Sequence, residues 1–421
     1  MSGSTLIQKI LANASGREDE GVAENEIVFV SPHIILSHDN SAAISKTFYK
    51  IAGPNGKVWD PNRIFIALDH TVPAPTTVQA DNQKLVRKFV HDQGIKKFYE
   101  GGEGICHQVL PEKGYVPPNV VILGSDSHTT THGAFGAAGI PIGRTETASV
   151  WAIGQTWLKV PESFKITIDG QPPKDVYAKD IILNIIREIT AAGATYKSIE
   201  FYGSTVDKMS ISERMTLSNL SAEMGAKTGI FPVDKITDEW NKQFGFKYDH
   251  ITADEDAKYE RELTFDVSSL TPQVAKPHKV DNVVPVTELP KTPIDVALIG
   301  TCTNGRLDDL QIAANVLKEK KIHPNVRMLV YPASREVLLQ ATKLGIIETL
   351  ITAGAQINVP ACGPCLGAYG GCIAGGEKAI SSANRNFKGR MGSKEDTGIY
   401  LASPATVAKS ALAGFITSEV V

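Results

Sequence analysis

The chain of 421 residues exceeds the roughly 250–300 residues at which one hydrophobic core stops growing, so two or three domains are expected. Its formal net charge of −3 leaves no basic field, which argues against nucleic acid and anionic membrane surfaces as partners. Hydrophobic residues make up 42% of the chain, but no apolar run approaches the ~20 residues of a membrane span, which excludes a transmembrane protein.

The N-terminus and the cysteine count bear on the compartment. Residues 1–20 hold a short apolar patch without a signal-peptide core, and they predict a short amphipathic helix that ends at Gly16. Five cysteines, an odd number in a long chain, argue against a disulfide framework. We therefore expect a cytoplasmic protein whose cysteines serve another purpose.

Short β-branched runs alternate with helical patterns along the chain. The expected strands end in polar or glycine-rich loops and cover residues 26–36, 63–70, 120–124, 296–300, 326–331 and 357–361. The expected helices cover residues 178–190, 307–319 and 335–347. This alternation predicts an α/β fold with parallel sheets covered on both faces. Such sheets bind ligands beyond the carboxyl ends of their strands, where most of the unusual residues here fall.

The periodicity fades between Asp249 and Pro293, in a stretch with several prolines and mixed charge. This composition is typical of a linker or of a segment that crosses between domains. We therefore place a domain boundary near residue 285, with one part over residues 1–284 and another over 285–421.

Three cysteines form a pattern that suits a metal cluster. Cys302 follows an expected strand, and Cys362 and Cys365 form a C-x-x-C pair. Thiolates bind soft metals, and three of them can hold three corners of an iron–sulfur cube while the fourth iron stays open. A structural zinc site would need a fourth ligand, and no histidine lies within ten residues of these cysteines. The plain alternative is a set of buried cysteines, the interpretation we prefer for Cys106 and Cys372.

Two Asp/His clusters stand at expected strand ends. They are Asp69-His70 and Asp126-Ser127-His128, with His107 and His132 as further candidates. An aspartate beside a histidine can hold one tautomer and keep the ring protonated near neutral pH, as a proton donor requires. Taken singly, each histidine is more often a capping or core group. Together with the thiols, they favour a catalytic site.

Two further groups carry amides and charges. The segment NRNFKGR contains Asn384, Arg385 and Arg390, and the planar fork of arginine suits a carboxylate or phosphate. Its alternative is a solvated basic loop. Asn219 and Glu223 are four residues apart on an expected helix, so they share a face that could orient a water or hydroxyl. By themselves they would be an ordinary exposed pair.

These segments together resemble the aconitase superfamily, from about residue 25 to the C-terminus. The motifs that carry the resemblance are GSDSHTTTHGAFGAAG (124–139), GTCTNGR (300–306), ACGPCLG (361–367) and NRNFKGRMGS (384–393). The resemblance implies three α/β/α domains with parallel-rich sheets around a central iron–sulfur site. It also implies a 4Fe-4S cluster with one iron not bound by cysteine. Members of the superfamily remove water from a hydroxy acid and add it back.

The motif match also implies roles for individual residues. Cys302, Cys362 and Cys365 would hold the cluster. The residues implied in proton transfer and catalysis are Asp69, His70, His107, Asp126, Ser127, His128 and Glu223. Those implied in binding substrate are Asn219, Asn384, Arg385 and Arg390.

The resemblance further implies a partner. The chain stops at Val421, soon after NRNFKGRMG, where full-length aconitases continue into a swivelling fourth domain. We therefore expect a separate small subunit that carries this domain and the catalytic base, as in 3-isopropylmalate dehydratase, homoaconitase and dimethylmaleate hydratase.

Among the substrates of these enzymes, we expect 3-isopropylmalate first. It is an intermediate of leucine biosynthesis. Arg144 could contact a substrate carboxylate or pair with Glu146, and we favour the pairing. The alternative functions from other classes are an RNA-binding regulator without a cluster and a non-catalytic metal scaffold.

Overall fold

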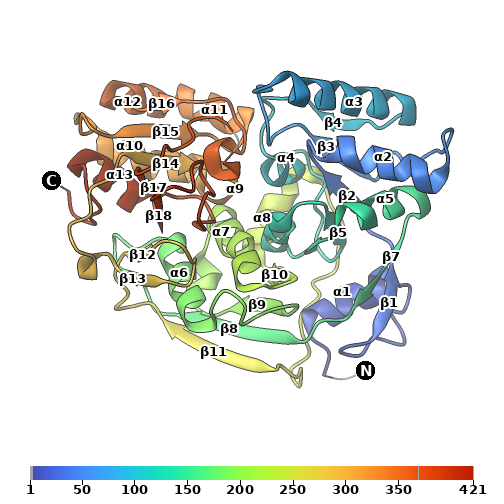
Figure 1. Ribbon diagram of the computed structural model, residues 1–421. Coiled ribbons are helices and arrows are strands. Elements are labelled where there is room, and N and C mark those ends of the chain that lie inside the picture. Colours follow the sequence, from blue (N-terminus) through green and yellow to red (C-terminus); the bar gives the residue numbers. More distant parts are fainter. Residues whose placement is uncertain (1–2, 368, 421) are drawn as a thin grey trace.

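The computed structural model describes residues 3–367 and 369–420, which form four β-sheets with helices packed around them (Figure 1). The chain opens with helix α1 (Leu6–Ala14), which buries Leu6, Ile10 and Leu11 on one face and ends before Gly16, as predicted. No described helix is long and apolar enough to cross a membrane.

The first sheet is parallel, with strand order β4-β3-β2-β5-β6. Its strands are β2 (Ile34–Ser37), β3 (Ile64–Ala67), β4 (Lys97–Tyr99), β5 (Val121–Gly124) and β6 (Ala138–Pro141). Ile64 and Ile66 pack with one set of helices, while Phe65 and Ala67 pack with the other. Both faces are therefore buried, which explains the continuous apolar runs in the sequence. The helices are α2 (Ser41–Ala52), α3 (Thr77–Gln93) and α5 (Arg144–Ile153) on one face, and α4 (Cys106–Glu112) and η1 (Ser127–Phe135) on the other.

The second sheet is also parallel, with strand order β10-β9-β8-β11. Its strands are β8 (Ser163–Asp169), β9 (Ser198–Tyr202), β10 (Thr228–Ile230) and β11 (Arg261–Asp266). Helices α6 (Ala178–Ile189) and α7 (Ile211–Ser221) share its hydrophobic core. Shorter helical segments on this part of the chain are η2 (Val206–Lys208), η3 (Ala222–Met224), α8 (Lys235–Asn241) and η4 (Lys242–Phe244).

The third sheet has the order β13-β12-β18-β17-β14-β15-β16, parallel from β18 to β16 and antiparallel at β12 and β13. Its strands are β12 (Gln273–Ala275), β13 (Val283–Pro285), β14 (Val296–Gly300), β15 (Arg327–Tyr331), β16 (Gln356–Ile357), β17 (Lys378–Ser381) and β18 (Gly398–Ala402). One face packs into the core of the second sheet through Val296 and Leu298. The other packs against helices that include α10 and α13 through Ala297 and Ile299. The helical segments are η5 (Val286–Glu288), α9 (Thr301–Asn304), α10 (Leu307–Leu317), α11 (Arg335–Lys343), α12 (Ile346–Ala353), η6 (Gly363–Leu366) and α13 (Pro404–Ala413).

Three expected elements differ from the structure. The single strand expected over 26–36 is wrong: β1 (Ile27–Val30) pairs antiparallel with β7 (Thr156–Lys159), and β2 joins the first sheet. Pro32, which has no N–H to donate, stands between the two strands. The helix expected over 335–347 breaks at Gly345, whose φ of +74° ends α11 and starts α12. Of the last expected strand, over residues 357–361, only Ile357 lies in a strand, β16 (Gln356–Ile357).

The stretch of weak periodicity contains β11, β12 and β13. The last two are the strands at one edge of the third sheet. The boundary near residue 285 stays a prediction. What matters for function is that the loops after β3, β5, β14 and β17 carry Asp69, Asp126, Cys302 and Asn384.

Candidate active site

The three predicted cysteines lie together and are buried. Cys302 is in α9, directly after β14. Cys362 is the residue before η6, and Cys365 lies within η6. Asn384 bridges two of them: its Nδ2 donates to the Cys302 Sγ at 3.3 Å, and its Oδ1 accepts from the Cys365 Sγ at 3.3 Å. Asn219, from α7, donates its Nδ2 to Cys302 as well, at 3.3 Å. Four segments of the chain therefore converge on one sulfur-lined site.

The thiols differ in their readiness to ionise. A hydrogen bond from Cys362 holds the pKa of Cys365 well below its usual range, and the guanidinium of Arg390, whose Nη2 lies 3.8 Å from that sulfur, acts in the same direction. Burial raises the pKa of Cys302 to about 12, and the nearby charge of Cys365 adds to this rise. The thiolate is the metal-binding form, and the Cys362–Cys365 pair gives up a proton more readily than Cys302 does.

Glycines bring the backbone close around these thiols. Gly300, at the end of β14, has a φ of +137°, and a Cβ there would lie 2.2 Å from the carbonyl oxygen of Tyr331. Only glycine tolerates both this backbone conformation and this approach. The turn into α9, and with it the place of Cys302, depends on the absence of a side chain at this position.

Gly300→Ala is expected to lower the free energy of unfolding by about 3 kcal/mol, because backbone strain and a backbone clash add together. Gly345→Ala is the control, since its φ is also positive but nothing lies within 4 Å of the added Cβ; its cost should stay near 1 kcal/mol. Urea denaturation of both variants measures the difference. Equal losses would contradict this account of Gly300.

Asp126 is the centre of the histidine network. Its carboxylate accepts from His107 Nε2 at 2.7 Å and from the His128 backbone N–H at 2.8 Å, and it lies 3.4 Å from His70 Nε2. The other ring nitrogen of His70, Nδ1, contacts the Asp69 carboxylate at 2.6 Å. The two predicted Asp/His clusters are therefore one network, because β3 and β5 both end at this edge of the first sheet.

Charge within this network favours a protonated His70. Burial opposes its charged form, but Asp69 and Asp126 outweigh burial and raise the pKa of His70 well above its ordinary value. Burial likewise opposes the charged form of Asp126, yet its hydrogen bonds with His107, His128 and His70 hold its pKa well below the usual range. An imidazolium between two carboxylates results, which suits a proton donor.

Glu223 and Arg385 extend the histidine network to the segment that carries Asn384. The Glu223 carboxylate accepts from His128 Nε2 at 2.9 Å and from Arg385 Nε at 2.8 Å. Arg385 also donates to Ser127 Oγ at 2.9 Å. Its side chain is 22% exposed, so it is among the groups of the site that still reach solvent. Asn219, in α7 (Ile211–Ser221), contacts Cys302, whereas Glu223 lies in η3 (Ala222–Met224) and contacts His128 and Arg385.

Arg390 has hydrogen-bonding capacity left over. Its Nε is buried and has no partner among the described residues. A buried donor without an acceptor is costly, and an anion placed beside it would remove that cost. This orphaned donor belongs to the same guanidinium whose Nη2 lies 3.8 Å from the Cys365 sulfur.

Sequence reasoning missed His38 and Asp39, which follow β2. The His38 ring stacks on His70 with centroids 3.8 Å apart, and its Nε2 lies 4.0 Å from Asp126. Asp39 accepts from the backbone N–H groups of Asp69 and His70 at 2.9 and 2.8 Å. The available signal was their place at a strand end in SHDNS, the same signal that identified Asp69 and Asp126.

Of the remaining candidates, Cys106 touches the network through its backbone N–H, which donates to Asp69 at 2.6 Å. His132 is buried, neither of its ring nitrogens has a partner among the described residues, and burial holds its pKa well below the usual range. Cys106 is buried and Cys372 is exposed. Arg144 is exposed at the start of α5, and Glu146 accepts from the Gly143 N–H at 2.6 Å. Within the described residues, no ion pair joins Arg144 to Glu146.

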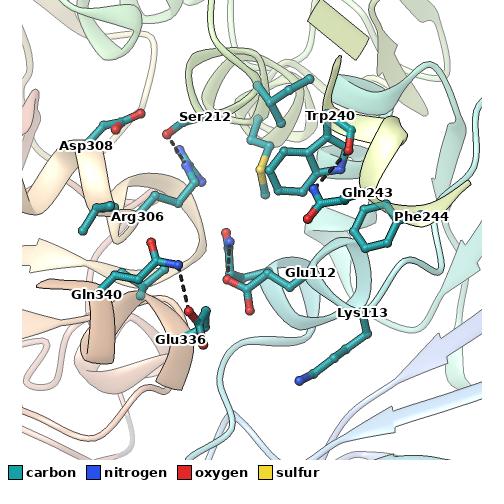
Figure 2. A pocket seen from close by; sticks show the side chains of 15 residues that line it. Glu112, Lys113, Ser212, Trp240, Gln243, Phe244, Arg306, Asp308, Glu336 and Gln340 are labelled. Carbon is teal, nitrogen blue, oxygen red and sulfur yellow. Dashed lines mark hydrogen bonds between the residues drawn. The ribbon is translucent and has the colours of Figure 1, made fainter. Parts of the chain in front are cut away.

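A separate cavity of about 480 Å³ is lined by Arg306 and other residues from several parts of the chain (Figure 2). Glu112, Trp240 and Glu336 are among the side chains that line it, and none of the predicted site residues does. Arg306 stands in its wall, donating to Ser212 Oγ at 2.8 Å and to the Cys302 carbonyl at 3.0 Å. Through Arg306 the cavity is therefore connected to the backbone carbonyl of Cys302 and not to its sulfur.

The three cysteines and the groups around them suit a metal group bound by thiolates. Three soft sulfur donors, one from α9 and two from the η6 segment, lie near two side-chain amides and one guanidinium. Structural zinc usually takes a fourth protein ligand, whereas an iron–sulfur cube accepts three thiolates. The residues present fit the cluster better than zinc.

The family model of the aconitase family (aconitate hydratase) matches residues 8–293 and 286–414 of the chain. The chain belongs to the aconitase family. This assignment confirms the predicted α/β fold with parallel-rich sheets and makes the chain a hydro-lyase of that family.

Relatives in the aconitase family match over nearly their full length. The 3-isopropylmalate dehydratase large subunit 1 of Methanopyrus kandleri is 49% identical over 99% of this chain and 98% of its own. The methanogen homoaconitase large subunit of Methanocaldococcus jannaschii is 44% identical over 99% of each. Among solved structures, aconitase X of Thermococcus kodakaraensis matches 85% of this chain and 84% of its own, with 13% identity and a TM-score of 0.48. That likeness is too low to add to the assignment.

Proposed function

We propose that the chain is the large subunit of an iron–sulfur hydro-lyase that dehydrates and rehydrates a branched hydroxy di- or tricarboxylic acid. The observation that carries the proposal is a histidine network around Asp126 that reaches Arg385 through Glu223, while the adjacent Asn384 contacts a buried three-thiol site. Proton donors, anion-binding groups and a soft-metal site are what water elimination beside a carboxylate requires.

Cys302, Cys362 and Cys365 would hold a 4Fe-4S cluster with one iron free of cysteine. When bound, that cluster would supply a Lewis acid for the substrate's oxygen atoms. Asn219 and Asn384 would orient Cys302 through the amide hydrogen bonds that they already make to its sulfur. Such outer contacts set the direction of metal ligands and tune their basicity.

The chain's own groups would handle the proton and the substrate charge. His70 would give its proton from Nε2 to the departing hydroxyl, with Asp69 holding the ring at Nδ1. Asp126 would keep His70 charged, with His107 holding that carboxylate in place. The ion pairs of Glu223 with His128 and Arg385 would fix a second donor set beside Ser127.

Substrate carboxylates would bind to the arginines of the NRNFKGR segment. Arg385 faces solvent in part, and Arg390 has its buried, unpartnered Nε to offer. A planar guanidinium grips a carboxylate through two parallel hydrogen bonds. The two arginines, five residues apart, suit a substrate with more than one carboxylate.

The partner and substrate are further parts of the proposal. Because the relatives are named large subunits, we propose a separate small subunit that carries the swivelling domain and the base, in a cytoplasmic heteromer. We propose 3-isopropylmalate as the first substrate, in leucine biosynthesis. A homoaconitase substrate is the alternative, supported by the homoaconitase names among the relatives, and dimethylmaleate hydratase chemistry is the third candidate.

Anaerobic reconstitution with iron, sulfide and the cognate small subunit tests the proposal. Alkene formation is followed in parallel from isopropylmalate, homocitrate, citrate and dimethylmalate. We expect turnover of one branched hydroxy acid and much less with the large chain alone. Full activity without the small subunit would refute the two-chain assignment, and no turnover of any acid would refute the substrate class.

A further inference from the structure

Lys179 is a buried cation directly beneath the candidate site. It is the second residue of α6 and is 0% exposed. Its Nζ donates to the carbonyl oxygens of Ser382 at 2.8 Å and Ala383 at 2.5 Å. Both acceptors are backbone carbonyls and not carboxylates, so peptide dipoles solvate the charge.

Keeping an ammonium group in this place is costly. Burial lowers the pKa of Lys179 to about 7, while the nearby charges of Asp309, Cys365 and Cys302 act in the opposite direction. A methionine would fill similar space without the desolvation cost. The lysine is therefore better explained by what its hydrogen bonds hold than by its packing.

Those hydrogen bonds hold the turn that carries the site residues. Strand β17 ends at Ser381, the two carbonyls bound by Lys179 follow, and Asn384 and Arg385 come directly after them. The same turn is tied to β14 by the Ser382 N–H, which donates to the Leu298 carbonyl, and by the Gly300 N–H, which donates to Ser382 Oγ at 3.1 Å. Lys179 reaches the same turn from α6, which packs in the core of the second sheet.

The turn matters because the two residues that follow it contact two different groups of side chains. Asn384 contacts the sulfurs of Cys302 and Cys365, and Arg385 contacts Glu223 and Ser127. A shift of the carbonyls would move both side chains at once, since they share one backbone. Displacement of about 1 Å at a positioned group can cost around 100-fold in rate.

The start of α6 is itself well anchored. Asp180 is buried, and its carboxylate accepts from the backbone N–H groups of Tyr177 at 2.9 Å and Gln273 at 2.8 Å. Gln273 begins β12, so these bonds tie α6 to the third sheet, beside which it lies in Figure 1. The Lys179 side chain therefore extends from a rigid base.

We propose that Lys179 is a positioning residue that holds the Ser382–Ala383 turn, so that Asn384 faces the thiols while Arg385 faces Glu223. The structural part of this proposal concerns the chain by itself. Its catalytic part rests on the proposed hydro-lyase function.

The test compares Lys179→Met, which removes the donors, with Lys179→Gln, which keeps N–H donors but no charge. Lys343→Met, at an exposed site on α11, is the matched control. The first readout is amide hydrogen exchange in the chain without a cluster. We expect residues 382–386 to exchange at least tenfold faster in Lys179→Met, with α6 and β12 unchanged, and Lys179→Gln to recover much of the protection.

The second readout is turnover by the reconstituted two-chain enzyme. Lys179→Met should lower kcat/KM about 100-fold, with a rise in KM from the displaced Arg385, and Lys179→Gln should recover at least tenfold of the loss. Exchange and kcat/KM both within twofold of wild type would overturn the proposal. Exchange that rises equally across α6, β12 and the turn would also overturn it, because it would indicate a merely structural role.

Two results keep this test separate from the larger proposal. If Lys179→Met does not fold, Lys179→Gln decides. Faster exchange at the turn alone would support the proposal, and an equal rise across α6, β12 and the turn would overturn it. If the wild-type enzyme turns over none of the hydroxy acids, the exchange measurement still decides whether Lys179 holds the turn.

Discussion

Cys365→Ser is expected to yield a folded chain that retains little iron and loses nearly all turnover. Serine keeps the shape of the side chain, but its hydroxyl does not ionise near neutral pH and is a poor ligand for a soft metal. Loss of a metal that supplies several kcal/mol of transition-state stabilisation corresponds to a drop of about 100- to 1000-fold in kcat. Iron and sulfide content per chain, measured after anaerobic reconstitution, checks the first part, and kcat checks the second.

The matched control for this prediction is Cys372→Ser. Cys372 is exposed and lies outside the thiol set, so its substitution should leave iron content and turnover near the wild-type values. Cys302→Ser should behave like Cys365→Ser, since Asn384 joins the two sulfurs. A Cys365→Ser enzyme with full iron content and full activity would remove Cys365 from the site.

Asp126→Asn is expected to lower kcat/KM by about 100-fold and to alter its pH dependence, because one carboxylate serves three histidines. The negative charges of Asp69 and Asp126 raise the pKa of His70 against the effect of burial. Without the charge at residue 126, that pKa falls. Protonated His70 is then lost at lower pH, so the alkaline limb of the kcat/KM profile moves to lower pH.

The pH profile separates a catalytic effect from simple loss of fold. The exposed Asp81 on α3 is the control, and Asp81→Asn should leave both rate and profile unchanged. Thermal unfolding of each variant reports its stability. An Asp126→Asn enzyme with lower activity but an unmoved alkaline limb would show that Asp126 does not govern the proton donor.

The fold class followed from the sequence, but several element boundaries did not. Alternating apolar runs and helical patterns predicted parallel sheets, because a strand buried on both faces must be apolar throughout. The run at 26–36 looked like one strand, yet its halves pair with β7 and with β3 and β5. Pairing partners far away in the chain decided this split, and a local pattern does not contain them.

The site shows the same division. Cys302, Cys362 and Cys365 were recognisable by spacing, and Asp69, Asp126 and their histidines by their place at strand ends. His38 stood at an equivalent strand end without an obvious partner in sequence, and its partner proved to be the ring of His70. Lys179 carried no signal at all, since a lysine near a helix start is ordinarily solvated.

The amino-acid sequence by itself determined which chemical groups are available: three thiols for a soft metal, acids beside histidines for proton transfer, and arginines for carboxylates. It also determined membership of the aconitase family. Only the tertiary structure decided that Asp126 is shared by the histidines, that Asn384 bridges two sulfurs, and that Lys179 donates to the two carbonyls before Asn384. The reason is physical: a side chain's functional group is a local property, whereas its burial, charge state and partners depend on residues brought near from other parts of the chain.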